Sequence, residues 1–334
     1  MSMNSALYDL DEDFSSDAVE QHAEFGQTTA RYNLLLVKTS LLLDAVIAGD
    51  FKASDIAREL TQSVMNGAET ASLVTTQVEA PGTPRQLRAT QALDAAVIAA
   101  AMGRRMSLPP SMLRDLTTAA LLHAVGIDLL PDSLQDELAI KQSAEFSDFM
   151  QYPQLGAECI ESCGGFSPVV AQLVSQHRER LDGTGFPMRM RESQFHRHAS
   201  IIGAVREYQM RAVRNQSVMP AAALARLYLG LRHAYGEHVV DSLIATLTVY
   251  PPGSFLALSD GSIGRVMKVT HSARLKPTVW IYEEDHEPTK APVVDLAEKR
   301  ELSVLCVLDP EKLAPNVVKF FGGAWGGVSF QSVA

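Results

Sequence analysis

Apolar side chains recur at every third or fourth position through most of the first 250 residues, which is the spacing of one face of an amphipathic helix. This pattern predicts helices over residues 31–49 and 54–67. A break rich in proline and glycine follows, and then come an alanine-rich helix over 86–105 and a helix over 111–125. The last of these is apolar nearly all round, so we expect it to lie in the core. Further helices are predicted over residues 154–162, 168–177, 199–213 and 221–247.

The helical pattern stops at the Tyr-Pro-Pro-Gly sequence of residues 250–253. Beyond it, alternating β-branched residues predict a small β-module of roughly four strands. From Phe320 the chain reads Phe-Phe-Gly-Gly-Ala-Trp-Gly-Gly. We interpret this tail as a loop that lays aromatic rings on a partner surface, in the same chain or on another one. The four strands are expected at residues 254–258, 263–269, 278–282 and 302–308.

Composition and charge narrow the class of protein. With 46% hydrophobic and 20% charged residues, the 334-residue chain has the composition of a globular protein. Its net charge of -10 argues against binding to a nucleic-acid polymer, which requires a basic surface. No apolar run reaches the length of a membrane span, and the acidic N-terminal stretch has no signal-peptide pattern. Three cysteines do not make a disulfide framework, so we expect a cytoplasmic protein.

Residues 1–30 contain seven acidic side chains and no lysine or arginine. Such a segment is typical of a mobile arm, and a docking tail for a basic partner is the alternative. The face of residues 34–47 is broad, which leaves open a homodimer through the N-terminal helices.

Polar chemistry is densest in residues 177–187, His-Arg-Glu-Arg-Leu-Asp-Gly-Thr-Gly-Phe-Pro. Gly183 and Gly185 permit backbone angles that other residues avoid, and Pro187 fixes the exit direction of the chain. The sequence therefore places a histidine, acids and arginines beside a rigid turn. His123 lies at the end of the apolar 111–125 helix, where a histidine is more often a hydrogen-bonded core residue than a ligand.

Four stretches in this order resemble the HD-GYP family of bacterial cyclic di-GMP phosphodiesterases. Residues 121–132, Leu-Leu-His-Ala-Val-Gly-Ile-Asp-Leu-Leu-Pro-Asp, are similar to the family's "LLHDIGKxxIPD". Residues 151–158, Gln-Tyr-Pro-Gln-Leu-Gly-Ala-Glu, are similar to its "xHPxxGAE", and residues 177–187 to its "HHERxDGxGYP". The segment that begins at Tyr250 resembles the β-extension that often follows the domain.

The resemblance implies a mainly α protein: an HD-domain-like helical bundle with N-terminal helices and a small C-terminal β-module. We accordingly divide the chain into four regions. They are an acidic flexible arm (1–30), an N-terminal helical region (31–80), a degenerate HD-GYP helical domain (86–249) and a small β-rich extension (250–334).

The chain departs from the family at most of the metal-binding positions. Family members hold two or three metal ions, often iron or manganese, with histidines and aspartates from several helices. Of seven such positions, only His123 and His177 keep a ligand in this sequence. The replacements are Gln91 for an upstream histidine, Ala124 for the aspartate after His123, Tyr152 for the histidine of "HP", Arg178 for the second histidine of the pair, and Arg206 for a later aspartate; Ile127 replaces a lysine of the same motif.

Alanine supplies no metal ligand, and a protonated arginine brings positive charge instead of a lone pair. We therefore expect no metal cofactor and a catalytically inactive protein, in which His123 and His177 are vestigial. Arg178 and Arg206, with Arg214 as a displaced third candidate, would form a metal-free phosphate clamp for cyclic di-GMP. The alternative is that the arginines pair with buried acids and close the old cavity. A residual metal-dependent phosphodiesterase is the third hypothesis.

The turn is better preserved than the metal site, since Asp182, Gly183, Gly185 and Pro187 all match the family and Phe186 keeps the ring of its tyrosine. In the family this loop is thought to contact partner proteins, including diguanylate cyclase domains. The sequence thus predicts a regulatory, protein-binding module whose partner surface includes these five residues. A purely structural role, with Asp182 capping the turn and Phe186 anchoring it, would explain the same motif.

Overall fold

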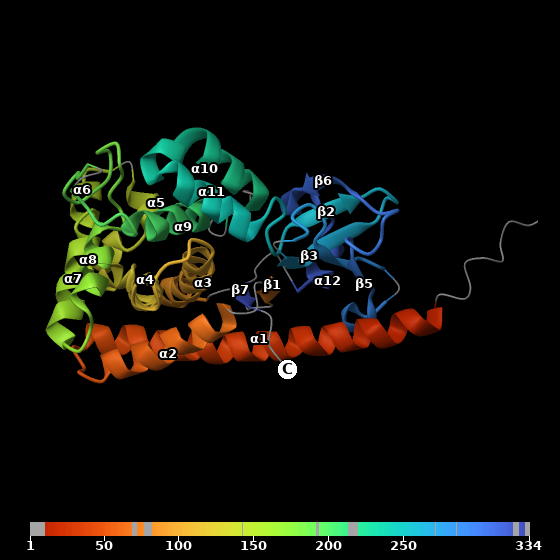
Figure 1. Ribbon diagram of the computed structural model, residues 1–334, viewed down its shortest axis with the longest axis horizontal. Coiled ribbons are helices and arrows are strands. Elements are labelled where there is room, and N and C mark those ends of the chain that lie inside the picture. The colour runs from red at the N-terminus through yellow and green to blue at the C-terminus, as the bar shows by residue number, and fades with distance from the viewer. Residues whose placement is uncertain are drawn as a thin grey trace, which may run out of the picture.

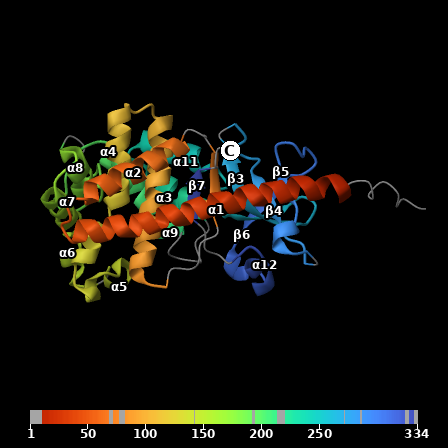
Figure 2. The ribbon, with the colours of Figure 1, turned by 90° about the horizontal axis from the view of Figure 1, so that it is seen from below.

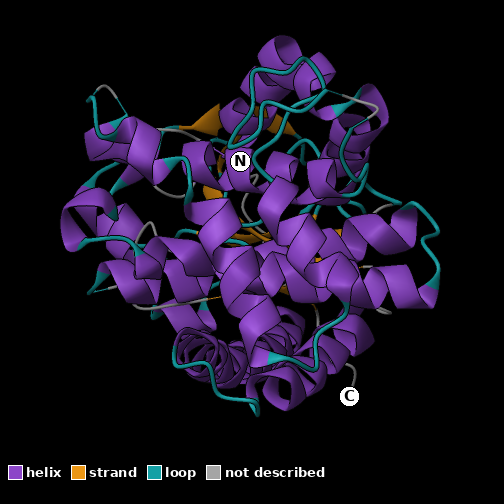
Figure 3. Ribbon diagram, turned by 90° about the vertical axis from the view of Figure 1, so that its left-hand side faces the viewer, coloured by secondary structure: helices purple, strands orange, loops and turns teal. Residues whose placement is uncertain are grey.

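The computed structural model describes residues 11–68, 72–76, 82–141, 143–191, 194–212, 220–270, 272–284, 286–322 and 327–330. Over these residues the protein is mainly helical with one antiparallel sheet, so the predicted fold class is confirmed. Helices gather at one end of the molecule and strands at the other, and the long helix α1 (Asp11–Ile47) runs beneath both (Figure 1). From the helical end, helices and their connecting loops face the viewer and the strands lie behind them (Figure 3).

The helical body is built on α3 (Pro84–Arg105), in which every residue from 88 to 103 is buried. Thr83 begins this helix with a capping box: its side chain accepts from the Gln86 amide, and the Gln86 side chain accepts from the Thr83 amide. The other helices of the body are α2 (Ala53–Gly67), α4 (Pro110–Leu122), α5 (Glu137–Ile140), α6 (Phe146–Phe149), α7 (Tyr152–Cys163), α8 (Pro168–Gln176), α9 (Ala199–Ala212), α10 (Pro220–Tyr235) and α11 (Glu237–Leu247), with short 3-10 turns η2 (Val125–Leu129) and η3 (Asp132–Leu134).

Helix α4 is buried along its C-terminal half, as its apolar sequence predicts. It ends at Leu122, a turn earlier than expected, and the chain continues into η2. Within the described residues, no helix combines the length and the apolar character needed to cross a membrane.

The sheet has the strand order β5-β4-β3-β1-β7, with β2 beside β3 and β6 beside β2. Its strands come from distant parts of the chain, because β1 pairs with β3 at Ser72 opposite Thr270 and with β7 at Leu73 opposite Phe330. The strands are β1 (Ser72–Thr76), β2 (Phe255–Leu258), β3 (Ile263–Thr270), β4 (Thr278–Ile281), β5 (Val293–Asp295), β6 (Val304–Leu308) and β7 (Gly327–Phe330), accompanied by η4 (Pro288–Lys290), η5 (Pro310–Lys312) and α12 (Pro315–Phe320).

The prediction for the N-terminal end of the chain needs correction. The mobile-arm prediction is wrong from Asp11 onward, where α1 begins. Helix α1 is fastened to the β-module: His22 Nε2 donates to the Ala291 carbonyl at 3.0 Å, and the Phe25 and Trp280 rings are 6.3 Å apart.

The aromatic tail packs within its own chain. Phe320 and Phe321 lie against Trp280, with ring centroids 5.8 and 5.1 Å away, so these two rings are not displayed for a partner. Strands β1, β5 and β7 were not predicted, and β1 joins the sheet from a region expected to be helical. The division of the chain into four regions stays a prediction.

Candidate functional site

His123 and His177 meet in the centre of the helical body. Each is the first residue after a buried helix, α4 or α8, and each is fully buried. In both rings Nδ1 donates to the backbone carbonyl three residues earlier, at 2.8 Å to Ala120 and 2.7 Å to Val174. The ring centroids are 5.4 Å apart. Because Nδ1 carries the proton in each ring, Nε2 holds the lone pair that a metal would need.

Tyr152 uses the lone pair of His177. Its hydroxyl donates to His177 Nε2 at 2.9 Å, and burial raises the pKa of Tyr152, so the hydroxyl keeps its proton. Burial, and then the neighbouring His123, lowers the pKa of His177 well below its ordinary value. Tyr152 therefore replaces one ligand of the family's metal site and blocks a second one. The Nε2 lone pair of His177 accepts a hydrogen bond from the Tyr152 hydroxyl and is not open to a metal.

His123 Nε2 has no hydrogen-bond partner among the described residues. Burial, and then the positive charge of Arg206, lowers the pKa of His123 to about 3. The ring is thus neutral at physiological pH, and the charge of Arg206 acts against a positive charge on it. A cation approaching this nitrogen would be repelled by the same guanidinium.

Glu137 lies between the two arginines that replace metal ligands. Arg178 Nη2 donates to Glu137 Oε1 at 2.8 Å, and Arg206 Nη2 lies 3.5 Å from Glu137 Oε2. Arg206 also donates to the Gln91 side chain at 2.7 Å, so Gln91 supports an arginine rather than a metal. All four side chains are buried. Two positive charges and one negative charge thus occupy this volume.

The ionisation of Glu137 depends on those arginines. Burial by itself would raise the pKa of the carboxyl, but the charges of Arg178 and Arg206 outweigh it, and the pKa lies below its ordinary value. A carboxylate held between two guanidiniums is a stable buried arrangement only while all partners are present. The prediction that the arginines pair with a buried acid agrees with this geometry, and the acid is Glu137.

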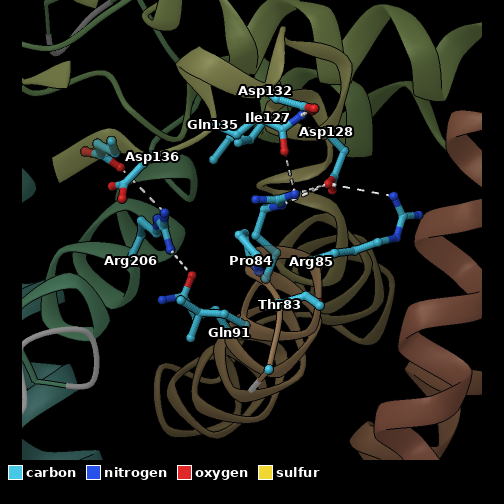
Figure 4. A pocket seen from close by; sticks show the side chains of 14 residues that line it. Thr83, Pro84, Arg85, Gln91, Ile127, Asp128, Asp132, Gln135, Asp136 and Arg206 are labelled. Atoms are coloured by element: carbon cyan, nitrogen blue, oxygen red, sulfur yellow. Dashed lines mark hydrogen bonds and ion pairs between the residues drawn. The ribbon is translucent and has the colours of Figure 1, made fainter. Parts of the chain in front are cut away.

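Asp128, five residues after His123, contacts two arginines of helix α3. Arg88 donates to it through Nε at 2.9 Å and also through Nη2, and Arg85 Nη1 lies 3.8 Å away. These residues line a pocket of about 820 Å³ whose wall also includes Gln91 and Arg206 (Figure 4). The pocket therefore opens beside the arginine cluster.

Apolar side chains stand at two further positions of the family's motif. Ala124 and Ile127, at the positions of the family's aspartate and lysine, are buried in a cluster with Tyr152 and Phe186. Neither side chain has a polar atom that could bind a metal, and Ile127 also lines the pocket beside Asp128 (Figure 4).

The loop of residues 182–187 is rigid and half buried. Asp182 Oδ1 accepts from the Thr184 amide at 2.9 Å and from its hydroxyl at 2.7 Å, which caps the turn. A Cβ on Gly185 would lie 2.4–2.6 Å from three backbone atoms, so only glycine fits there. Phe186 is buried, with the Arg178 guanidinium 4.8 Å from its ring centroid. The structural role of this motif is thus visible in its contacts.

The loop is also held by Glu179, whose role the sequence did not reveal. Its carboxylate accepts from the backbone amides of Met188 at 2.7 Å and Met190 at 2.8 Å. The face left to solvent consists of Asp182, Thr184 and Met188, the last 68% exposed.

The fold brings four of the sequence-predicted residues together: His123, His177, Arg178 and Arg206. Arg214 lies outside the described residues, and Asp182 is on the surface. Sequence reasoning missed Glu137, which follows Asp136 directly, stands ahead of a short apolar run and carries no motif. Its function as a shared counter-ion is set by tertiary packing.

Comparisons with known proteins agree with this fold. Residues 71–236 match the family model described as HD domain. The chain is 26% identical over 216 residues to the cyclic di-GMP phosphodiesterase PA4108 of Pseudomonas aeruginosa, an alignment covering 63% of this chain and 52% of the relative. It is 23% identical over 183 residues to the cyclic di-GMP phosphodiesterase PdeB of Borreliella burgdorferi, covering 54% and 48%. The chain thus spans about half the length of these curated relatives.

A solved structure adds a likeness of fold. It is Bd1817, an HDG"Y"P protein from Bdellovibrio bacteriovorus, with a TM-score of 0.52 and 16% identity over 68% of this chain and 76% of that one. The fold and the family match define an HD-domain protein. The chain is homologous to bacterial cyclic di-GMP phosphodiesterases.

The residues at the centre of this domain do not fit the iron or manganese centre that the HD-GYP resemblance implies. Of the two imidazoles, His177 is hydrogen-bonded through Nε2 and His123 faces Arg206. The one nearby carboxylate, Glu137, is bound by two guanidiniums. In the described part of the chain, no three or more His, Cys, Asp or Glu side chains are grouped so that they could hold a metal ion.

Proposed function

We propose that this chain is a catalytically inactive HD-GYP-like protein that acts as a regulatory, protein-binding module in bacterial cyclic di-GMP-linked signalling. Its homology to cyclic di-GMP phosphodiesterases supports the signalling context. The observation that carries the proposed inactivity is the buried cluster of Arg178, Glu137 and Arg206. The cytoplasmic location stays a prediction of the sequence.

The chemical argument rests on charge and on lone pairs. Metal-dependent phosphodiester hydrolysis needs cations that activate a water molecule and neutralise the phosphate. Here two guanidiniums occupy ligand positions, and they neither donate lone pairs nor lose their charge. A single uncommitted imidazole nitrogen, on His123, is too small a donor set for a metal pair.

The inactivity is tested by following cyclic di-GMP hydrolysis by the full chain with added Mn²⁺ or Fe²⁺ under anaerobic conditions. We expect the wild-type rate to equal that of His123→Ala and of buffer alone. Turnover by the wild type that is lost in His123→Ala would show a residual phosphodiesterase and overturn the proposal.

The protein-binding part of the proposal rests on the surface of the 182–187 loop. Its backbone is fixed by Asp182, Gly185 and Glu179, so a partner meets a preformed surface and loses little loop entropy on binding. Met188, exposed beside it, supplies an apolar contact. The partner that the family resemblance favours is a diguanylate cyclase domain.

Biolayer interferometry of the full chain against a purified diguanylate cyclase domain tests this surface. Met188→Glu is expected to weaken binding by about tenfold or more, which corresponds to about 1.4 kcal/mol. Leu275→Glu is the matched control, since Leu275 is 63% exposed on the β-module. Absent binding by the wild type, or equal losses in both variants, would contradict the assignment of this surface.

A second candidate function is a cyclic di-GMP receptor without catalysis. The pocket of about 820 Å³ favours it, because Arg85, Arg88 and Arg206 line one cavity. Its weakness is that Arg178 is not among the lining residues and that Arg206 pairs with Glu137. Calorimetric titration with cyclic di-GMP decides between the two candidates. Binding that is lost in Arg206→Gln and kept in Arg232→Gln would favour the receptor, and absent binding favours the interaction module.

A further inference from the structure

Helix α1 exposes large apolar side chains on its outer face. Leu34, Val37 and Leu41 are 58%, 58% and 54% exposed, and Phe51 at the following turn is 73% exposed. The opposite face of the same helix is packed into the core through Tyr32, Leu42 and other buried residues. The helix is therefore apolar on two sides, and the fold of one copy uses only one of them.

The exposed positions follow a regular pattern. Seven of the exposed positions from residue 23 to residue 44 are separated alternately by four and three residues, which is the spacing of the seam of a two-helix interface. Alanines at its N-terminal end allow close approach, and the leucines and valine supply bulk in the middle. The seam consists of Ala23, Gln27, Ala30, Leu34, Val37, Leu41 and Asp44, all exposed.

Nothing described in the structure covers this stripe. Seen from below, α1 crosses the whole molecule with α2 beside it, and no other element lies in front of either helix (Figure 2). The exposed residues of α2 are polar, among them Asp55, Arg58 and Gln62, and Glu59 of α2 lies 3.9 Å from Lys38 of α1. An apolar centre with a polar rim is the arrangement of a protein interface.

We propose that α1 pairs with α1 of a second copy of this chain along the seam of residues 23–44. The charge of the protein disfavours a lipid surface or a nucleic acid as the partner of this stripe. The net charge is -10, and the first 30 residues contain seven acids and no lysine or arginine. Anionic lipid surfaces and nucleic acids both require a basic contact face. A two-fold pair brings the same stripe of each copy together, which satisfies both exposed faces at once.

The size of the seam sets the strength of the dimer. Its 22 residues extend about 33 Å, and a helix about 10 Å wide covers roughly 330 Å² of each copy. This is below the roughly 800 Å² per partner of a standard interface, and side chains of α2 add a polar rim. The dimer is thus expected to be weak and transient.

Ionic strength separates this pairing from the binding of a basic partner. Two copies that each carry -10 repel one another, so added salt screens the repulsion and strengthens an apolar dimer. Attraction between this acidic protein and a basic partner would weaken with salt. The sign of the salt effect therefore reports the kind of contact.

Sedimentation velocity of the full chain from about 0.1 to 100 μM, in reductant, tests the proposal. We expect a concentration-dependent dimer whose dissociation constant falls as salt rises. Leu34→Glu with Leu41→Glu should weaken it by about tenfold or more, because each copy then places two charges in the seam. Leu305→Glu, at a 67% exposed position on β6, should leave the dimer unchanged.

The glutamates replace exposed side chains, so the variant is expected to keep the fold, and far-UV circular dichroism checks this. A wild type that is monomeric at the highest concentration overturns the proposal. So does a dimer of the folded Leu34→Glu, Leu41→Glu variant that is as strong as the wild type, because the contact would then lie elsewhere.

Discussion

Removal of Glu137 tests whether the arginine cluster is a closed ionic unit. In Glu137→Leu, Arg178 and Arg206 lose the carboxylate that lies 2.8 and 3.5 Å from their nitrogens. At an effective dielectric constant of 20, each contact has a gross attraction of about 5 kcal/mol. Desolvation offsets much of this, and removing one partner of a buried ion pair costs about 3–5 kcal/mol. We expect a loss of that size, which is a large part of a typical domain's stability of about 5–15 kcal/mol.

The measurement is urea unfolding at pH 7 followed by circular dichroism at 222 nm. The triple variant Glu137→Leu, Arg178→Met, Arg206→Met should recover most of the loss, since a buried ionic cluster replaced by apolar side chains is often neutral in stability. Glu158→Gln, at an exposed position, should not change the free energy of unfolding. If Glu137→Leu unfolds within about 1 kcal/mol of the wild type, the reasoning fails, because that cost is no more than a surface pair's.

Three further substitutions, one of them with a matched control, test buried contacts of the helical body. Asp94 accepts from the Tyr32 hydroxyl, and burial raises the pKa of the Asp94 carboxyl to about 7. The stabilising contribution of this carboxyl is therefore present below its unfolded pKa and is lost as the pH rises to about 7. Thermal unfolding of Asp94→Asn should lose this pH dependence, and a pH slope identical to the wild type's would contradict the assignment. Tyr152→Phe leaves His177 Nε2 buried without a donor and should cost about 1–3 kcal/mol in urea unfolding; an unchanged midpoint would refute that bond. Gly185→Ala should destabilise the protein by about 1–3 kcal/mol, because the added Cβ would overpack the loop. In the control Gly230→Ala the added Cβ meets no atom within 4 Å, and the substitution should stabilise its helix by about 0.5–1 kcal/mol. Equal effects of the two substitutions would show that the Gly185 contacts are relieved.

The sequence predicted the helical body because its apolar residues are periodic over long segments, as in α3 and α4. Strands β1 and β7 escaped prediction since each is short and its partners are far away in the chain, Thr270 for Ser72 and Phe330 for Leu73. The acidic composition of residues 1–30 predicted a mobile arm, and it gave no sign that Phe25 would pack against Trp280 and hold α1 on the β-module.

Only the site residues that belong to a recognisable sequence motif could be predicted. Spacing and resemblance placed His123, His177 and Arg178 near one another, and the fold brings them together. The Glu137 contacts, and the hydrogen bond from Tyr152 to His177, depend on how short helices α5 and α7 dock on the body. No local pattern encodes such docking, so the sequence did not show which side chains Glu137 and Tyr152 would contact.

The metal content of the full chain tests the central claim most directly. The protein would be purified without chelators from cells grown with iron and manganese, and analysed by plasma mass spectrometry beside its His123→Ala variant. The ionic cluster of Arg178, Glu137 and Arg206 predicts no stoichiometric iron or manganese in either protein. About two equivalents of metal in the wild type, as in a two-metal site, and their loss in His123→Ala would contradict it.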